Sequence, residues 1–112
     1  LQSLNNMNFS KSKNTLLFKI NNRNNYLNFL NEIKSNINIK NIIIDLNEFN
    51  FDEIFDDLNN LFTDSKNNNR SFVIIKSDYR SEYQSIKMNI VPSLQEAIDI
   101  IEIEEIERDL GL

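Results

Sequence analysis

Six acidic side chains are concentrated between residues 45 and 57, and they are the group in this sequence most able to do chemistry. They follow an apolar run typical of a strand, and open α/β sheets bind ligands beyond the carboxyl ends of their strands. Carboxylate oxygens suit Mg²⁺, so a magnesium-dependent enzyme is one interpretation. The alternative, which we favour, is that two of them cap a helix while others face water, with no metal or cofactor bound. The six are Asp45, Glu48, Asp52, Glu53, Asp56 and Asp57.

The residue types that the chain lacks restrict its chemistry further. It contains no histidine and no cysteine, which removes the commonest general base, the usual zinc ligands and every nucleophile that needs a histidine partner. Its single glycine is Gly111, so no glycine-rich loop can hold a phosphate or a dinucleotide. Most enzyme classes are thereby excluded, and we expect a non-enzymatic protein with no catalytic residue, no metal site and no cofactor.

The C-terminal segment carries the clearest structural signals. Ser93, followed three residues later by Glu96, predicts a capping box in which the two side chains satisfy backbone N–H groups of a first helical turn. Pro92 precedes this cap, and Gly111 stands where a left-handed C-terminal cap is expected. Residues 94–112 contain seven acidic residues and one arginine. Their net charge of −6 therefore accounts for the formal charge of −5 of the whole chain.

The predicted C-terminal helix has two apolar stripes that face opposite ways, since successive residues of a helix are about 100° apart. The first stripe can pack on a sheet, whereas the second needs another cover, either the rest of the domain or a partner. We expect this cover to be a partner protein or a second copy of the chain, with the acidic residues at the rim. The first stripe comprises Leu94, Ala97, Ile98 and Ile101, and the second comprises Ile100, Ile103, Ile106 and Leu110.

Strands and helices that alternate along the chain must position these residues. An apolar hairpin at residues 7–10 and 15–20 precedes an amphipathic helix at 26–33 and a β-branched strand at 41–46. Asn50 with Glu53, or alternatively Asp52, can cap a second helix that reaches residue 62, and a buried strand follows at 71–76. A weak helix or loop at 78–86 and a short strand at 88–91 lead to the capped tail. This order predicts an α/β fold with a mostly parallel central sheet and helices packed on it.

The same order resembles the STAS domain, the fold of anti-sigma factor antagonists, over nearly the whole chain. The closest stretch is residues 42–51, IIIDLNEFNF, which is similar to the "LVLDLSGVxF" strand and loop of that family. The ending, a short strand and then "SLQEAI", is also similar to the way these domains close. The resemblance implies a regulatory protein-interaction domain. Its partner would bind at the loop and helix start, through Asn47, Phe49, Asp52, Glu53 and Asp56.

The sequence departs from the family where STAS antagonists are phosphorylated. They continue with "IDSSGL", whose serine takes the phosphate that switches partner binding, but here Ile54 and Phe55 stand at the serine positions. Neither has a hydroxyl group, so we expect no such switch. The tail also resembles short Bacteroidetes proteins, some of which carry the name ribonuclease Z. That activity needs a histidine-rich two-zinc site, so the alternative from this resemblance is an accessory protein without nuclease activity.

Composition also suggests where the chain acts and what it contacts. No apolar run is long enough to cross a membrane and no signal-peptide pattern opens the chain, so we expect a cytoplasmic protein. The basic residues before the tail are scattered among acids, which argues against a nucleic-acid partner. We expect Met7 to be the initiator, residues 1–6 to be an appended segment, and residues 7–112 to form a single STAS-like domain.

Overall fold

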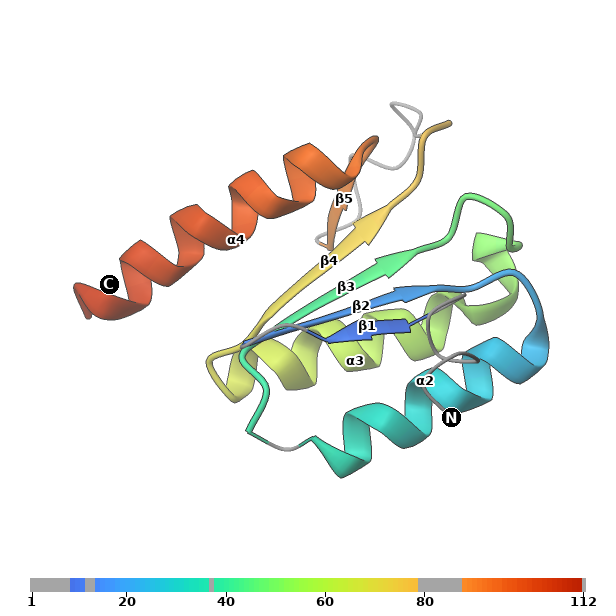
Figure 1. The fold of residues 1–112 in the computed structure, drawn as a ribbon, viewed down its shortest axis with the longest axis horizontal. Coiled ribbons are helices and arrows are strands. Elements are labelled where there is room, and N and C mark those ends of the chain that lie inside the picture. The colour runs from blue at the N-terminus through green and yellow to red at the C-terminus, as the bar shows by residue number, and fades with distance from the viewer. Residues whose placement is uncertain (1–8, 12–13, 37, 79–87, 112) are drawn as a thin grey trace.

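The described part of the chain forms one five-stranded sheet with helices on both of its faces (Figure 1). The computed structural model describes residues 9–11, 14–36, 38–78 and 88–111. Strand order follows chain order, β1-β2-β3-β4-β5, and every neighbouring pair except antiparallel β1 and β2 is parallel. The predicted α/β class and mostly parallel sheet are confirmed. The strands are β1 (Phe9–Lys11), β2 (Thr15–Lys19), β3 (Asn41–Asp45), β4 (Ser71–Ile75) and β5 (Asn89–Val91).

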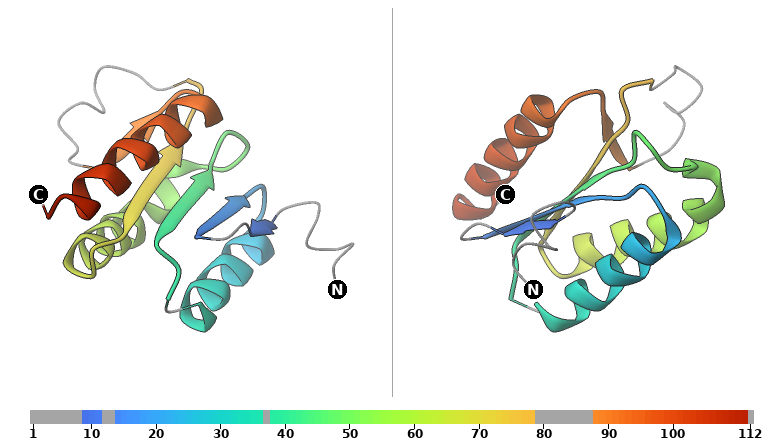
Figure 2. Two further views of the ribbon diagram at one scale, coloured as in Figure 1. Left: turned by 60° about the vertical axis from the view of Figure 1, so that its left-hand side comes forward. Right: turned by 45° about the vertical axis from the view of Figure 1, so that its right-hand side comes forward.

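The helices form two unequal layers. The crossovers from β2 to β3 and from β3 to β4 place α2 (Arg23–Ser35) and α3 (Phe55–Asn67) on the same face of the sheet (Figure 1). After β5, α4 (Leu94–Asp109) returns across the opposite face (Figure 2). It packs on β4 and β5, so the same face of β1 and β2 has no helix over it in the described residues.

The alternation of side chains along each strand divides the core between these two layers. Alternate residues of β2, β3 and β4, such as Leu16, Ile42 and Phe72, pack with Phe29 of α2 and Leu58 of α3 in one core cluster. The residues between them pack under α4 in a second, smaller cluster. Because helices cover both faces of β3 and β4, these strands read as continuous apolar runs. The second cluster comprises Ile43, Val73, Ile75, Val91, Ala97 and Ile101.

Helix α2 begins earlier than its apolar spacing predicts. Asn22 is its N-cap, and the Asn22 side-chain oxygen accepts the Asn25 backbone N–H at 2.9 Å. This bond satisfies one of the four N–H groups that a helix start leaves without a partner. The predicted segment 26–33 is therefore the inner part of α2, from which Tyr26 and Phe29 enter the core. Leu27 faces outward and is 48% exposed.

Three predictions meet limits in the structure. The hairpin strand predicted at residues 7–10 appears as β1, but residues 7 and 8 lie outside the described residues. The side chains of β1 are not described either. The weak helix or loop predicted at 78–86 and the expectation for residues 1–6 also lie outside the described residues, apart from Asp78, which forms a turn with Ser77. Within the described ranges, none of the helices combines the length and the apolar character needed to cross a lipid bilayer.

Candidate functional site

At the carboxyl end of the sheet, the loop after β3 is fastened to the loop after β4. The side-chain oxygen of Asn47 accepts the backbone N–H of Ser77, which is 30 residues away in the sequence. The Asn47 backbone N–H donates to Asp45 Oδ1 at 2.9 Å, which holds the turn in shape. Asn47 was predicted to bind a partner, and its side-chain oxygen is already engaged in this contact between loops.

Lys76 lies directly beneath these loops and was not singled out from the sequence. It is 9% exposed, although a lysine is rarely buried without a partner. Its ammonium group donates to the Leu46 carbonyl at 3.3 Å and lies 3.3 Å from Asp78 Oδ1. The available signal was its position immediately after the buried run of β4. Its contacts add a second tie between the two loops.

The ring of Phe49 joins the loop after β3 to helix α2. Phe49 is half-buried against the first core cluster and stacks on Tyr26, with ring centroids 6.4 Å apart and ring planes inclined by 22°. The Tyr26 hydroxyl donates to Asp57 Oδ2 at 2.7 Å, which ties α2 to the start of α3. Burial of Tyr26, and then its bond to Asp57 and the charge of that carboxylate, raise the pKa of the phenol. Phe49 therefore presents only part of its surface to a partner.

The start of α3 differs from the prediction. A 3₁₀ turn, η1 (Phe51–Ile54), comes first, and Asn50 Oδ1 accepts the Asp52 N–H at 3.0 Å. Asn50 is therefore a cap, as predicted, but of the 3₁₀ turn that leads into α3 and through a bond to Asp52 rather than Glu53. The regular α-helix begins after Ile54, which has no side-chain cap. Ile54 is 3% exposed in the first core cluster. Its burial contributes about 1.5–3 kcal/mol, which exceeds the roughly 1 kcal/mol of a typical cap.

The six carboxylates that suggested magnesium chemistry are dispersed. Glu48 pairs with Lys19, with Nζ and Oε2 3.3 Å apart, while Asp45 and Asp57 accept the hydrogen bonds described above. In the part of the chain that the structure describes, no three acidic groups are placed to hold a metal ion together. The remaining three are exposed near the starts of η1 and α3, where the helix dipole favours negative charge. They are Asp52, Glu53 and Asp56.

Helix α4 begins as the sequence predicts. Ser93 is its N-cap, with the hydroxyl oxygen accepting the Glu96 N–H at 3.2 Å. The Ser93 hydroxyl also donates to Glu96 Oε1 at 3.1 Å. The Glu96 carboxylate thus accepts from the hydroxyl, whereas the predicted capping box has it accept from the Ser93 backbone N–H. Gly111 has a φ of 75°, which confirms the left-handed end of the helix.

The N-terminal half of α4 is attached to the sheet by apolar contacts. Ala97 and Ile101 are buried on the second core cluster, as predicted for the first stripe. Leu94 and Ile98 belong to the same stripe, but they are 42% and 36% exposed. They face β2, where no helix covers the sheet, and they line a groove of about 340 Å³ together with Leu17. The prediction that the whole stripe packs on the sheet is therefore wrong for these two residues.

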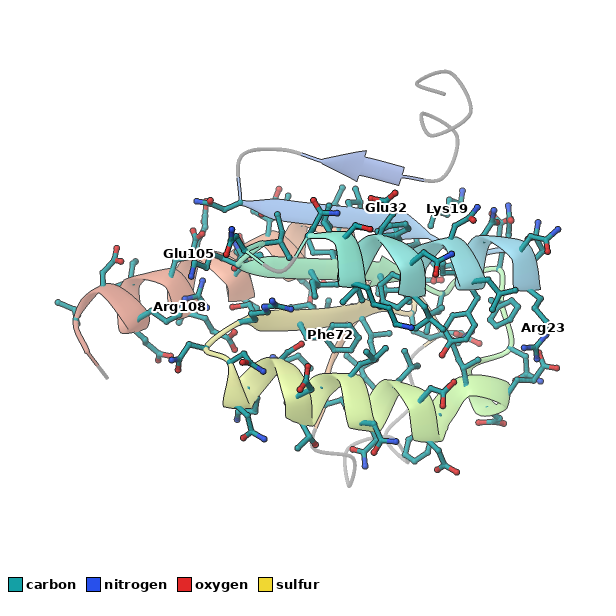
Figure 3. All side chains as sticks on the ribbon, turned by 90° about the horizontal axis from the view of Figure 1, so that it is seen from below. Lys19, Arg23, Glu32, Phe72, Glu105 and Arg108 are labelled. Atoms are coloured by element: carbon teal, nitrogen blue, oxygen red, sulfur yellow. The ribbon has the colours of Figure 1, made fainter. Side chains whose placement is uncertain are left out.

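The C-terminal half of α4 is attached by a polar network instead. The Arg108 guanidinium group donates to Ser71 Oγ at 2.7 Å and to Asn41 Oδ1 at 2.9 Å. The side-chain amide of Asn41 in turn donates through Nδ2 to Glu105 at 2.8 Å and to Thr15 at 3.3 Å. Figure 3 shows Glu105 and Arg108 at the same end of the sheet. Asn41 and Ser71 are fully buried, and Thr15, Asn41 and Ser71 form one row across β2, β3 and β4. The signal available in the sequence was a polar residue at the start of each apolar strand.

The opposite side of α4 carries three large aliphatic side chains into solvent. Ile103, Ile106 and Leu110 are 56%, 58% and 68% exposed, and we call them the outer stripe. Ile100 was predicted to belong with them, but it is half-buried and packs on the second core cluster. The final turns of α4 extend past the end of the sheet (Figure 1). The described elements of the domain therefore leave the outer stripe uncovered.

The structure keeps the two predicted sets of partner-binding residues apart. Asn47, Phe49 and the three exposed acids lie at the carboxyl ends of the strands, on the loop and helix start that follow β3. The outer stripe lies near the amino ends of the strands and on the other face of the sheet, because Arg108 bonds to the first residues of β3 and β4. A single partner surface that used both sets would have to wrap around the domain.

Comparison with known proteins adds no assignment to this geometry. No protein-family model matches the sequence, and no curated protein matches it either. Function is therefore inferred from the surfaces of this chain. Among the described residues, those of the outer stripe are the most exposed large apolar side chains.

Proposed function

We propose that this chain is a STAS-like protein-interaction domain that catalyses no reaction and binds a partner protein through the outward face of α4. The observation that carries the proposal is the exposure of Ile103, Ile106 and Leu110, each more than half accessible to solvent on one side of a single helix. Covering a large aliphatic side chain contributes roughly 1.5–3 kcal/mol, so a complementary surface would gain substantially from docking there.

The way in which α4 is held supports an external role for this face. Its inner face is occupied, by Ala97 and Ile101 in the first half and by Glu105 and Arg108 in the second. A helix secured on one side in this manner cannot turn its outer stripe inward without breaking the network around buried Asn41. The exposed residues are therefore fixed in position and ordered before binding, which reduces the entropy that a partner must offset.

The STAS-like part of the proposal has separate support. A hairpin strand followed by alternating parallel strands and helices is the order that the resemblance implies, and residues 42–51 span most of β3, the loop after it and the first residue of η1. The two positions aligned with the family's serines are Ile54 and Phe55. The first is buried in the core and the second is half-buried. Binding by this domain would consequently not be switched by phosphate at that helix start.

The proposal is tested by changing the outer stripe and looking for loss of one specific partner. The double variant Ile103→Ser/Ile106→Ser should fold as the wild type does, because both side chains are exposed. Leu27→Ser is the matched control, since Leu27 is similarly exposed on α2 in the other layer. Affinity capture from a native extract should retain the same protein on wild type and on the control, and lose it on the double variant.

The captured protein must then bind purified wild type in titration calorimetry, with affinity reduced by about tenfold or more in the double variant. The proposal is contradicted if the two substitutions destabilise a monomeric wild type by several kcal/mol, because the stripe would then belong to the core. It is also contradicted if capture is equal for all three proteins.

A further inference from the structure

We infer that the partner of the outer stripe is a helix whose own apolar seam is flanked by lysine or arginine, and not a second copy of this chain. The inference rests on the proposed function and deepens it by naming the chemistry of the partner. It follows from the spacing of the outer stripe and from the charges that border it.

The outer stripe has the spacing of a coiled-coil seam. Ile103, Ile106 and Leu110 are separated by three and then four residues, which are the a, d and a positions of a heptad. In the same register Glu104, Glu105 and Arg108 occupy positions away from the seam, and these side chains do face the sheet. A second helix can therefore lie along α4 on its outward side without disturbing the contacts that hold α4 in place.

The positions that border this seam are all acidic. Glu102 and Asp109 are at g positions, and Glu107 is at the e position between the seam residues. All three side chains are exposed, as are Glu96 and Asp99 in the preceding turns. In two-stranded coiled coils, charges at e and g select the partner and its orientation. A partner helix with lysine or arginine on both sides of its own apolar seam would therefore be complementary in charge to α4.

The one cation of α4 does not offset these carboxylates. Arg108 turns toward the sheet, where its guanidinium group donates to the uncharged acceptors Ser71 Oγ and Asn41 Oδ1. The outward face of α4 consequently presents carboxylates and no lysine or arginine of its own, although Lys66 and Arg70 line a cavity beside Glu107, and Lys40 lines one beside Asp109. The groove that Glu102 lines has no lysine or arginine among its described residues. A partner with a basic rim would be attracted over several ångströms at low salt, and its apolar centre would be aligned with the outer stripe.

The same charges disfavour a second copy as the occupant. In a parallel pair of α4 helices each g position faces an e position, and in an antiparallel pair g faces g and e faces e. Either arrangement would set Glu102, Glu107 and Asp109 against the same acids of the other copy. Like charges across such an interface are repulsive, so homotypic docking would lose part of what the apolar contact contributes.

The position of α4 leaves room for such a helix. Its C-terminal turns extend beyond the ends of the strands, and the views from the front and from below agree on this (Figures 1 and 3). A partner helix lying along the outer stripe would not meet α2, which lies on the other face of the sheet. At Glu107 it would approach Lys66 near the C-terminal end of α3, because these two residues line the same cavity. The docking surface is therefore α4 itself, and residues of the carboxyl-end loops are not required.

Designed helical peptides test the inference with the whole chain. The first probe carries isoleucine and leucine at a and d with lysine at e and g; the second is identical except for glutamate at e and g; the third keeps the lysines but has alanine at a and d. Affinity is measured by fluorescence anisotropy, and the bound surface by backbone NMR resonances. We expect the first probe to bind about tenfold or more tightly than the other two and to shift the resonances of residues 102–110.

Charge-exchange variants provide a matched control. Glu102→Lys/Glu107→Lys should reverse the preference, so that the glutamate peptide binds more tightly than the lysine peptide. Asp52→Lys/Glu53→Lys changes the net charge by the same amount at the other end of the sheet, and it should leave the preference unchanged. Ile106→Ser should weaken the lysine peptide by about tenfold, and rising salt should weaken it in every protein that binds it.

The outcomes separate this inference from the proposed function. Equal binding of the lysine and glutamate peptides, or equal binding of the alanine peptide, overturns the selection by charge. Self-association of the wild type that is lost in Ile106→Ser makes a second copy the occupant, which overturns the inference and leaves α4 as the docking surface. Failure of every peptide to bind also overturns the inference, and the proposed function then depends on the capture experiment alone.

Discussion

At the carboxyl end of the sheet several side chains with suggestive chemistry are engaged within the domain, whereas on the outward face of α4 chemically inert side chains are left in solvent. Asn47 bonds to Ser77, and Phe49 stacks on Tyr26. Ile106 and Leu110, in contrast, are 58% and 68% exposed. The two regions lie on different faces and at different ends of the same sheet.

The difference shows that the chemical type of a side chain does not determine whether that side chain is free to bind a ligand or already makes contacts within the domain. Carboxylates after a strand suggest a ligand site because of where such sites occur in α/β folds. In this chain, however, they accept hydrogen bonds, pair with Lys19 or lie near helix starts. Aliphatic residues on a helix suggest core, yet three of them face outward while a glutamate and an arginine fasten the inner face. The exposure of its side chains, more than their chemical type, distinguishes the surface that is available to bind a partner.

The sharpest way to break this comparison is to truncate isoleucines on the two sides of α4. Ile101→Ala removes a buried side chain from the second core cluster, and we expect a loss of about 2–5 kcal/mol in the free energy of unfolding. Ile103→Ala removes an exposed one and should change it by less than about 0.5 kcal/mol. Urea denaturation followed by circular dichroism measures both. Equal losses would place the outer stripe in the core and remove the distinction between the two faces.

The next effect concerns the polar attachment of α4. Arg108→Ala deprives Asn41 and Ser71, both fully buried, of their charged donor, and we expect a loss of about 1–3 kcal/mol in the free energy of unfolding. Lys40→Ala is the control, because Lys40 is exposed beside the same strand start, and it should cost less than about 0.5 kcal/mol. If both variants were equally stable, the network would not be holding the C-terminal half of α4.

This network also marks the limit of what the sequence could predict. The strands at 41–46 and 71–76 and the cap at Ser93 follow from local patterns: β-branched runs and a serine three residues before a glutamate. The bonds from Arg108 to Ser71 and Asn41 span 37 and 67 residues, and no local pattern encodes such a distance. The row of polar residues at the strand starts was visible, but its meaning depends on the register that aligns Thr15, Asn41 and Ser71.

Two further predictions were met only in part. Asn50 caps the segment that it was predicted to cap, but the segment starts as the 3₁₀ turn η1, and the regular α-helix begins only after buried Ile54. A helical wheel also cannot show which sector of α4 faces the sheet. Leu94 and Ile98 fit an apolar stripe, yet α4 leans over β4 and β5 and leaves them beside an open groove.

A smaller loss of stability is expected from a substitution at the carboxyl end of the sheet, the other region of the comparison. Phe49→Ala removes a half-buried ring that stacks on Tyr26, and we expect a loss of about 1–2 kcal/mol in the free energy of unfolding. Because the outer stripe lies on the other face and at the other end of the sheet from Phe49, the affinity for a ligand of the outer stripe should be unchanged. Calorimetric titration of wild type and variant with the lysine peptide measures this. A selective loss of binding with unchanged stability would move the docking surface to the loop after β3.

The smallest effect at neutral pH is expected for Tyr26→Phe, which removes the hydrogen bond to Asp57 and should cost about 0.5–1.5 kcal/mol. Its pH dependence is more informative. Burial and the Asp57 carboxylate raise the pKa of Tyr26 above its ordinary value, so the folded chain retains this proton where the unfolded chain releases it. The contribution of this protonated phenol is complete below the ordinary tyrosine pKa of about 10 and is lost as the pH rises above it, by about 1.4 kcal/mol for each pH unit. Wild type should therefore lose stability more steeply than Tyr26→Phe above about pH 10, when both are measured by urea denaturation at several pH values. Parallel pH profiles would mean that the pKa of Tyr26 is not raised, so that the phenol is neither buried nor bonded to Asp57 as described here. The carboxyl end of the sheet would then be less fully satisfied within the domain than its contacts indicate.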